Sequence, residues 1–208
     1  MSDIHEAFMT GPLQVNCQLL ADSRTGVAIL MDPGGNAPEI LKYLQKKGLT
    51  LTHIINTHGH FDHLGGVWEL QEATGCQFWI HEGDRALALA APRQAAVWGI
   101  PFGRAPRVDG GLEDGQVIRL AGYELTVLTT PGHSPGGVCF HWSGGVVVGD
   151  TLFQGSIGRT DLPGGEHRQL IRSIKERLLT LPDDTVCFPG HGPTTTIGEE
   201  RRRNPYLR

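Results

Sequence analysis

The sequence predicts an α/β protein in which two β-sheets pack face to face and helices cover their outer faces, an αββα four-layer sandwich. Two observations lead to this prediction. Short apolar stretches with strand-like patterns alternate with stretches of helical spacing, and a run of strands followed by helices occurs twice along the chain. Glycine, with 29 residues, and proline, with 13, are abundant enough for many short elements joined by turns. Two such sheets can bury one face against each other and the other face against helices.

The first run of elements covers residues 13–90. Strands are expected where apolar residues follow one another over a short stretch, at residues 13–20, 27–31, 51–56 and 77–81. Helices are expected where apolar residues recur every three or four positions, at residues 38–47, 64–73 and 83–90. In the first helix Ile40, Leu41 and Leu44 share one face, and Pro38 stands near the N-terminus, where proline is tolerated.

The second run begins after residues 92–112, which are rich in Pro, Gly and Arg and are predicted to form a long surface loop. Strands follow at residues 116–120, 123–129, 137–141, 146–149 and 185–188, the first two joined by a tight Ala121–Gly122 turn. Residues 167–179 read as one amphipathic helix and residues 196–204 as a closing helix.

Composition narrows the class of protein. The 208 residues show no change of composition and no linker, so we expect one domain over residues 1–208. The net charge is -4 without a wide basic patch, which argues against nucleic-acid binding, and no apolar stretch approaches the roughly 18 residues of a membrane span. The N-terminus lacks the features of a signal peptide. The scattered cysteines predict reduced, mostly buried thiols and a cytoplasmic protein: Cys17, Cys76, Cys139 and Cys187.

Side chains that bind metals gather after the predicted strands. Four of them stand within six positions, directly after the strand at residues 51–56: His58, His60, Asp62 and His63. Three more follow later strands: His133, Asp150 and His191. Loops at strand ends bring together groups from distant parts of a chain, so we expect these seven side chains to meet in one metal site.

The spacing favours two metals over one. Side chains two positions apart in an extended segment point to the same side, which applies to His58, His60 and Asp62. His63 lies one position further, at the start of the predicted helix, and can face elsewhere. Seven candidates also exceed the four ligands of one tetrahedral zinc. Imidazole and carboxylate groups suit zinc, iron or manganese.

Three nearby residues are less determined by the sequence. Asp32 ends the strand at residues 27–31, and it can either orient a ligand histidine or only shape a turn. Gly65 and Gly66 are expected in the first turn of the next helix, where small residues would let the backbone pack close to the metal loop.

The stretch Thr57-His58-Gly59-His60-Phe61-Asp62-His63 resembles the T-H-x-H-x-D-H motif of the metallo-β-lactamase superfamily, and His133, Asp150 and His191 follow in that family's order. This resemblance implies the αββα metallo-β-lactamase fold, with two mixed sheets and a dinuclear site at one edge. It further implies that His58, His60 and His133 hold the first metal. Asp62, His63 and His191 would hold the second, with Asp150 bridging the two.

Within that superfamily, the stretches at residues 153–165, 189–195 and 203–207 are similar to short bacterial glyoxalase II-like hydrolases. The resemblance implies a hydrolase that converts S-D-lactoylglutathione and water into D-lactate and glutathione, using a hydroxide that bridges two divalent ions, most simply zinc. Asp62 and Asp150 would be the catalytic carboxylates, and the partner would be a small thioester such as a glutathione conjugate. Longer glyoxalase II enzymes carry a C-terminal helical domain that binds glutathione, and most of that domain is not expected in these residues. Arg159 can instead bind a substrate carboxylate or pair with Asp161, and the ion pair is favoured.

Three other functions remain open at the level of the sequence. One is β-lactam hydrolysis, although the carboxylate bridge at Asp150 and the cysteine usage resemble glyoxalase II more than the antibiotic-hydrolysing branch. Persulfide dioxygenases share the fold and have a similar Gly-Arg-Thr-Asp stretch; their single iron would be held by His58, His133 and Asp150. A metal-binding scaffold without activity is the non-enzymatic alternative, and it is disfavoured because every ligand position of the motif is filled.

Overall fold

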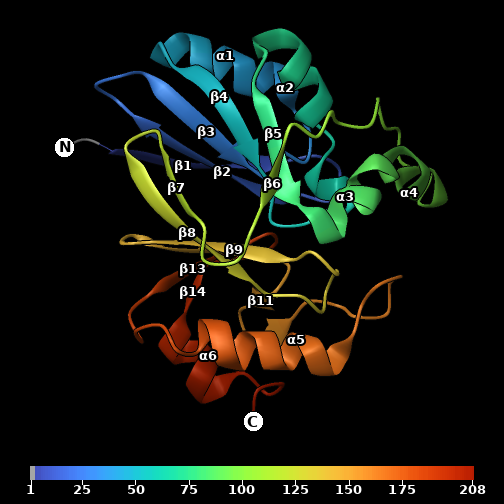
Figure 1. Cartoon of the computed structure of the whole chain (residues 1–208), viewed down its shortest axis with the longest axis vertical. Coiled ribbons are helices and arrows are strands. Elements are labelled where there is room, and N and C mark those ends of the chain that lie inside the picture. Colours follow the sequence, from blue (N-terminus) through green and yellow to red (C-terminus); the bar gives the residue numbers. More distant parts are fainter. Residues whose placement is uncertain (1–2) are drawn as a thin grey trace.

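The computed structural model describes residues 3–208 and arranges them in four layers (Figure 1). Helices α1 (Ala37–Lys47) and α2 (Val67–Thr74) cover the outer face of one sheet. Helices α5 (His167–Ser173) and α6 (Ile197–Arg203) cover the outer face of the other. The predicted αββα sandwich of two mixed sheets is therefore confirmed.

The first sheet contains six strands in sequence order: β1 (Asp3–Thr10), β2 (Val15–Asp22), β3 (Val27–Met31), β4 (Thr50–Ile55), β5 (Gln77–His81) and β6 (Gly110–Leu112). The pairs β1–β2 and β2–β3 are antiparallel, whereas β3, β4, β5 and β6 run parallel. Because β3 and β4 are parallel, the residues that follow both strands emerge at the same edge of the sheet. This arrangement places Asp32 beside the histidine motif.

The second sheet has the strand order β14-β13-β10-β9-β8-β7. Its strands are β7 (Val117–Leu120), β8 (Tyr123–Thr129), β9 (Val138–Trp142), β10 (Gly145–Gly149), β13 (Val186–Pro189) and β14 (Thr195–Thr196). Only β10 and β13 are parallel neighbours in it among the described residues. Asp150 and His191 therefore leave the sheet at the same edge. The hairpin β11 (Leu152–Phe153) and β12 (Ser156–Ile157) follows Asp150.

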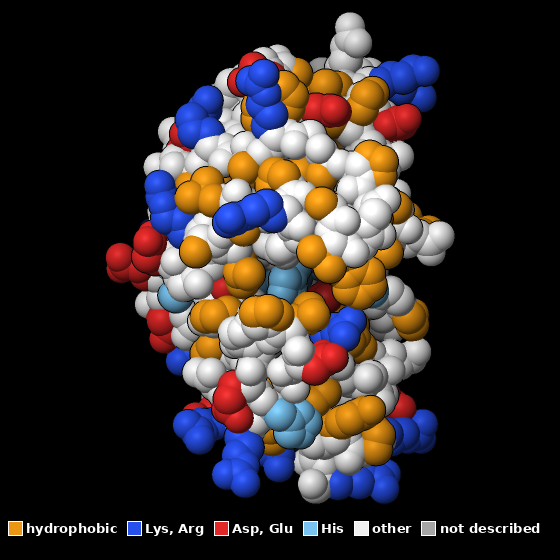
Figure 2. All heavy atoms as spheres, turned by 90° about the vertical axis from the view of Figure 1, so that its right-hand side faces the viewer, with side chains coloured by type: hydrophobic (Ala, Val, Ile, Leu, Met, Phe, Trp, Pro, Cys, Tyr) orange, Lys and Arg blue, Asp and Glu red, His pale blue; other side chains and the backbone are white. Residues whose placement is uncertain are grey.

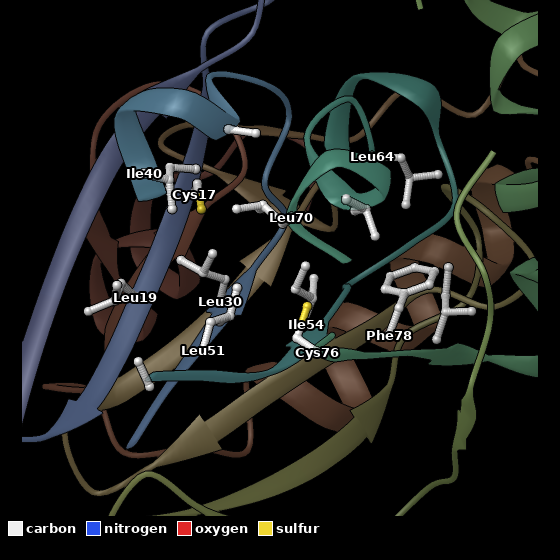
Figure 3. Packing of buried hydrophobic residues seen from close by; sticks show 14 of the residues in the cluster. Cys17, Leu19, Leu30, Ile40, Leu51, Ile54, Leu64, Leu70, Cys76 and Phe78 are labelled. Carbon is white, nitrogen blue, oxygen red and sulfur yellow. The ribbon is translucent and has the colours of Figure 1, made fainter. Parts of the chain in front are cut away.

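The core consists of three hydrophobic clusters between the four layers. Figure 3 shows the cluster between the first sheet and helices α1 and α2, where Leu30 and Ile54 meet Ile40 and Leu70. In β3, Leu30 belongs to this cluster, whereas its neighbour Met31 packs against the second sheet. Successive side chains of a strand point to opposite faces, so a strand covered on both sides is apolar throughout.

The loop predicted over residues 92–112 was wrong, and strand β1 of the first sheet was not predicted. The long loop expected over residues 92–112 contains helix α4 (Ala91–Val97) and strand β6, because the alanines between 90 and 96 favour a helix more strongly than the flanking Pro and Gly break it. Strand β1 was not predicted, since it is an edge strand with mostly exposed side chains. The helix expected over 167–179 is confirmed: it begins as α5 and continues into a π-helical turn, η2 (Ile174–Leu178).

The remaining predicted elements occur in the expected places, with ends shifted by at most three residues. Helix α3 (Glu82–Leu89) corresponds to the prediction for residues 83–90. All four cysteines are free and buried, as expected. Within residues 3–208, every helix is too short or too polar to cross a membrane.

Candidate metal centre

The seven predicted site residues lie together at one edge of the two sheets. The loop after β4 supplies four of them, with Asp62 and His63 in the 3₁₀ turn η1 (Phe61–His63). The other three come from the loops that follow β8, β10 and β13: His133, Asp150 and His191. The sequence prediction that strand ends converge on one site is confirmed.

His58, His60 and His133 form the first group of possible ligands. Each offers one ring nitrogen, and these nitrogens lie within 4.8 Å of one another. The closest pair is His60 Nδ1 and His133 Nε2, at 2.9 Å. All three side chains are buried. Three imidazoles with ring nitrogens this close together match the protein ligands of many zinc sites.

Asp62, His63 and His191 form the second group, whose ligand atoms also lie within 4.8 Å of one another. Asp62 Oδ2 is 3.3 Å from His191 Nε2 and 3.7 Å from His63 Nε2. His58 and His63 are neighbours across the two groups, with ring centroids 4.1 Å apart.

Asp150 lies between the two groups and reaches both. Its Oδ2 is 3.6 Å from His133 Nε2 in the first group and 3.7 Å from His191 Nε2 in the second. Its Oδ1 is 3.3 Å from His63 Nε2. A carboxylate in this position can bind to two metal ions at once.

Hydrogen bonds set the tautomers of the ligand histidines. His133 Nδ1 donates to the carbonyl oxygen of Arg159 at 2.7 Å, and His191 Nδ1 donates to that of Leu13 at 3.1 Å. Because a carbonyl oxygen can only accept, the proton of each neutral ring must sit on Nδ1. The Nε2 lone pair of both rings is then free to bind a metal, a common arrangement around metal-binding histidines.

Asp32 performs the orienting role that the sequence left open. Its two carboxylate oxygens accept hydrogen bonds from Thr57, one from the backbone N–H at 2.8 Å and one from the hydroxyl at 2.6 Å. Since the Thr57 hydroxyl donates to Asp32, it accepts from His58 Nδ1, which lies 3.1 Å away. Asp32 Oδ2 also lies 3.1 Å from His63 Nδ1. Asp32 therefore orients His58 through Thr57 and lies within ion-pair distance of His63, and its left-handed backbone (φ 54°) also shapes the turn.

The glycines after the histidine motif differ from the expectation. Gly65 and Gly66 precede helix α2, and they pack against the loop that follows Asp32. A Cβ atom on Gly65 would lie 2.3 Å from the carbonyl oxygen of Gly34. These small residues therefore allow the loops after β3 and β4 to approach each other.

Several buried polar atoms at this site lack a hydrogen-bond partner, which tests whether the residues fit a metal. They include His58 Nε2, His63 Nε2 and Asp150 Oδ1. Buried polar groups are rarely left unpaired, and a bound cation would satisfy all three. Burial lowers the pKa of His58 well below its usual value and that of His60 to about 4, so both rings are neutral at pH 7. The residues present fit divalent metal ions.

Comparison with known proteins decides the family. The family model described as the metallo-beta-lactamase superfamily matches residues 10–191, a segment that contains all seven site residues. The chain belongs to the metallo-beta-lactamase superfamily.

Similar members of the metallo-beta-lactamase superfamily match the chain along nearly its whole length. Hydroxyacylglutathione hydrolase GloC of Haemophilus influenzae is 39% identical over 203 residues, covering 93% of each chain. The structure of BLEG-1 B3 metallo-beta-lactamase has a TM-score of 0.90 at 36% identity and covers 98% of this chain and 99% of its own. The structure of TTHA1623 in a di-iron-bound form has a TM-score of 0.88 at 41% identity and covers 97% of this chain and 100% of its own.

In this superfamily member five of the seven candidate ligands line an open cleft of about 520 Å³: His60, Asp62, His133, Asp150 and His191. The cleft is bordered on one side by α3 and α4 and on the other by residues 159–163. Arg159 is the one Lys or Arg side chain that lines it. Its Nε and Nη2 donate to the two oxygens of Asp161, each at 2.7 Å, so the predicted ion pair is confirmed.

One functional residue escaped the sequence analysis. Asp84, in the first turn of α3, is fully buried, and its carboxylate accepts backbone hydrogen bonds from Gly59 and Gly136. These glycines belong to the loops that carry the first group of histidines. A lone aspartate in a predicted helix gives no signal of this role, because the partners are distant in sequence.

Proposed function

We propose that the chain is a metal-dependent hydrolase of thioesters, with S-D-lactoylglutathione as a substrate that it converts with water into D-lactate and glutathione. The observation that carries the proposal is the position of Asp150, whose carboxylate lines the cleft and reaches both groups of ligands. A hydrolase needs water and the carbonyl carbon brought together at such a point. The similarity to hydroxyacylglutathione hydrolase GloC and the glyoxalase II-like stretches support the choice of thioester.

The proposed cofactors are two divalent metal ions, most simply zinc, with iron or manganese as alternatives for the same ligands. His58, His60 and His133 would hold one ion, Asp62, His63 and His191 the other, and Asp150 both. Bound there, the ions would lower the pKa of a water molecule and polarise the substrate carbonyl.

Asp62 and Asp150 are the carboxylates that face the cleft. Burial alone would raise the pKa of each, but the neighbouring histidines, His63 foremost, together outweigh burial and lower both pKa values. Both groups are therefore ionised at neutral pH. As carboxylates they can accept hydrogen bonds and thereby orient a water molecule beneath the substrate.

The one-iron alternative, a persulfide dioxygenase, is less well supported by the geometry. A single iron held by His58, His133 and Asp150 would leave the second group without a role. That group is as compact as the first, since the ligand atoms of both lie within 4.8 Å. Two complete groups favour a dinuclear centre.

The test uses metal-replete protein and S-D-lactoylglutathione, with the loss of thioester absorbance as the readout. We expect turnover that is abolished in His58→Ala and retained in His167→Ala, a matched control at the exposed start of α5. Absence of turnover above the His58→Ala level would refute the substrate. One iron per chain by elemental analysis, together with oxygen uptake on glutathione persulfide, would favour the dioxygenase instead.

A further inference from the structure

The cleft above the candidate metal centre has an apolar side wall. Apart from the site residues, the side chains that line it are mostly hydrophobic: Leu13, Leu87, Val97, Trp98, Leu162 and Pro163. Figure 2 shows this face of the molecule, on which hydrophobic side chains surround a histidine near the centre. Leu87 of α3, Val97 of α4 and Trp98, which caps α4, form an apolar wall of this cleft.

Two residues of the apolar wall are left uncovered by the rest of the chain. Val97 is 86% exposed and Trp98 is 53% exposed, although both lie at the end of a helix that could have buried them. Single exposed apolar residues need no explanation, but a group of them around a cleft indicates a binding surface. Leu13, another exposed large hydrophobic side chain, lines the same cleft.

The apolar wall is fixed in place beside the metal-binding loop. Helix α4 packs against η1, and the ring of Trp98 lies 6.3 Å from that of Phe61, which stands between His60 and Asp62. Gln94 Nε2 donates to the carbonyl oxygen of Leu87 at 2.7 Å and so joins α4 to α3. The position of Trp98 relative to the candidate metal centre is therefore set by packing.

The opposite side of the cleft offers little charge to a substrate. The guanidinium group of Arg159 is bound to both oxygens of Asp161 and also lies 6.0 Å from the Trp98 ring. A substrate carboxylate would have to compete with Asp161 for this cation. The lining thus favours an apolar group over a charged one near the site.

We propose that Val97 and Trp98 bind an apolar group of the substrate, so that this chain prefers thioesters that carry a bulky aryl or alkyl group close to the reacting carbonyl. The proposal rests on the proposed thioester hydrolysis. The apolar group can belong to the acyl part or to the thiol part, and the experiment separates the two.

The first experiment compares thioesters hydrolysed by the metal-replete protein. S-phenylacetylglutathione carries the aryl group on the acyl part, the acetyl thioester of benzyl mercaptan carries it on the thiol part, and S-acetylglutathione carries none. We expect at least one aryl thioester to exceed S-acetylglutathione in kcat/KM by about tenfold, chiefly through KM, as one buried aromatic contact allows. The aryl thioester that gains shows which part meets the apolar wall.

Variants assign the preference to the apolar wall. Trp98→Ala and Val97→Ser should reduce the ratio of kcat/KM between the aryl thioester and S-acetylglutathione by about three- to tenfold. Tyr206→Ala is the matched control, because Tyr206 is a 52% exposed aromatic residue outside the cleft, and it should leave the ratio unchanged. Since Val97 is almost fully exposed, its variant should fold even if Trp98→Ala does not. The proposal would be overturned if Val97→Ser and folded Trp98→Ala both kept the kcat/KM ratio of the unmodified protein. It would also be overturned if the unmodified protein hydrolysed the aryl thioesters and S-acetylglutathione with equal kcat/KM.

A binding measurement separates this proposal from the proposed function. Calorimetry with S-benzylglutathione and S-methylglutathione, which are thioethers that cannot be hydrolysed, reports the preference without turnover. One outcome is that no thioester is hydrolysed, but S-benzylglutathione binds more tightly than S-methylglutathione and this difference depends on Trp98. Thioester hydrolysis would then be refuted, and binding of an apolar group by the apolar wall would be supported. If thioesters are hydrolysed but neither assay shows a preference for the compounds with an aryl group, thioester hydrolysis is supported and substrate binding by the apolar wall is refuted.

Discussion

The carboxylate of Asp84 accepts a hydrogen bond from the backbone N–H of Gly136 at 2.6 Å. Its other oxygen accepts one from the backbone N–H of Gly59 at 2.8 Å. Gly59 separates His58 from His60, and Gly136 lies three residues after His133. One buried side chain outside the metal centre therefore joins the two loops that make up the first group of ligands.

Asp84→Asn should weaken metal binding by the first group. The amide has one carbonyl oxygen, so its NH₂ group would face a backbone N–H and leave that donor buried without an acceptor, at a cost of about 1–3 kcal/mol. We expect the affinity of the first group for zinc to fall by about tenfold or more, a typical effect of losing an orienting contact. Equilibrium competition with a chelator measures it.

Asp109→Asn is the matched control for loss of stability alone. Asp109 also accepts hydrogen bonds from a backbone N–H, that of Phe78, and from the side chain of Gln71, but it does not line the cleft. It should lower the melting temperature without changing zinc affinity. Equal zinc affinity in the two variants would contradict the role of Asp84.

Variants of Thr57 and Asp32 should affect the two groups of ligands differently. Thr57→Val removes the hydroxyl that links Asp32 to His58, whereas the 3.1 Å approach of Asp32 to His63 remains. We expect Thr57→Val to weaken only one of the two zinc sites, by about 10- to 100-fold, and Asp32→Asn to weaken both. Titration of the apoprotein with zinc, followed by calorimetry, distinguishes one affected site from two. Identical profiles for the two variants would refute the separate paths.

The chemistry of the site was predictable because its residues share one sequence feature, their place directly after apolar strands. His58, His133 and His191 could be assigned to one site from that feature alone, and the strand order of the two sheets explains why it works. Asp84 and Trp98 could not be found in this way. Asp84 contacts backbone groups that are distant in sequence. Trp98 follows helix α4, which lies in a segment that was predicted to be a loop.

Elements of the fold could be predicted most accurately from the sequence where both of their faces are buried. Strand β3, apolar at every position, was predicted to its ends, whereas the edge strand β1 was missed because most of its side chains face solvent. Helix α4 was missed for a related reason. Its buried positions are Ala91 and Ala95, whose small side chains give no amphipathic pattern.

Proton release should differ between the two metal sites. Burial and neighbouring histidines keep the pKa values of His58 and His60 low, so both rings are already neutral at pH 7. Burial also disfavours the charged form of His63, but Asp150, Asp62 and Asp32 outweigh it and raise its pKa well above 6.5. His63 thus carries a proton in the apoprotein at pH 7 and must lose it to bind a metal.

We therefore expect zinc binding by the second group to release one proton or more, chiefly through His63 and also through His191, whose pKa Asp62 and Asp150 raise. His58 and His60 should release almost none. As the pH falls from 7 towards 6, affinity should decrease more for the second group than for the first. Calorimetric titrations in buffers of different ionisation enthalpy give the number of protons released at each step. Equal release at both steps would contradict the assignment of the charged ring to His63.

Gly190, between Pro189 and His191, has no room for a side chain. A Cβ atom there would lie 2.4 Å from Asp150 Oδ1 and 2.7 Å from His63 Cε1, closer than side-chain carbons approach such atoms. Gly190→Ala should therefore displace the carboxylate that reaches both groups, lower zinc content and reduce thioester hydrolysis by at least about tenfold.

Gly111→Ala provides the control for adding a methyl group, because a Cβ atom at Gly111 in β6 meets nothing within 4 Å. It should keep full zinc content and activity. Elemental analysis and the S-D-lactoylglutathione assay, run on both variants with matched melting curves, separate an effect on Asp150 from a general loss of folding. A Gly190→Ala protein with two zinc ions and undiminished activity would show that Asp150 need not occupy this position.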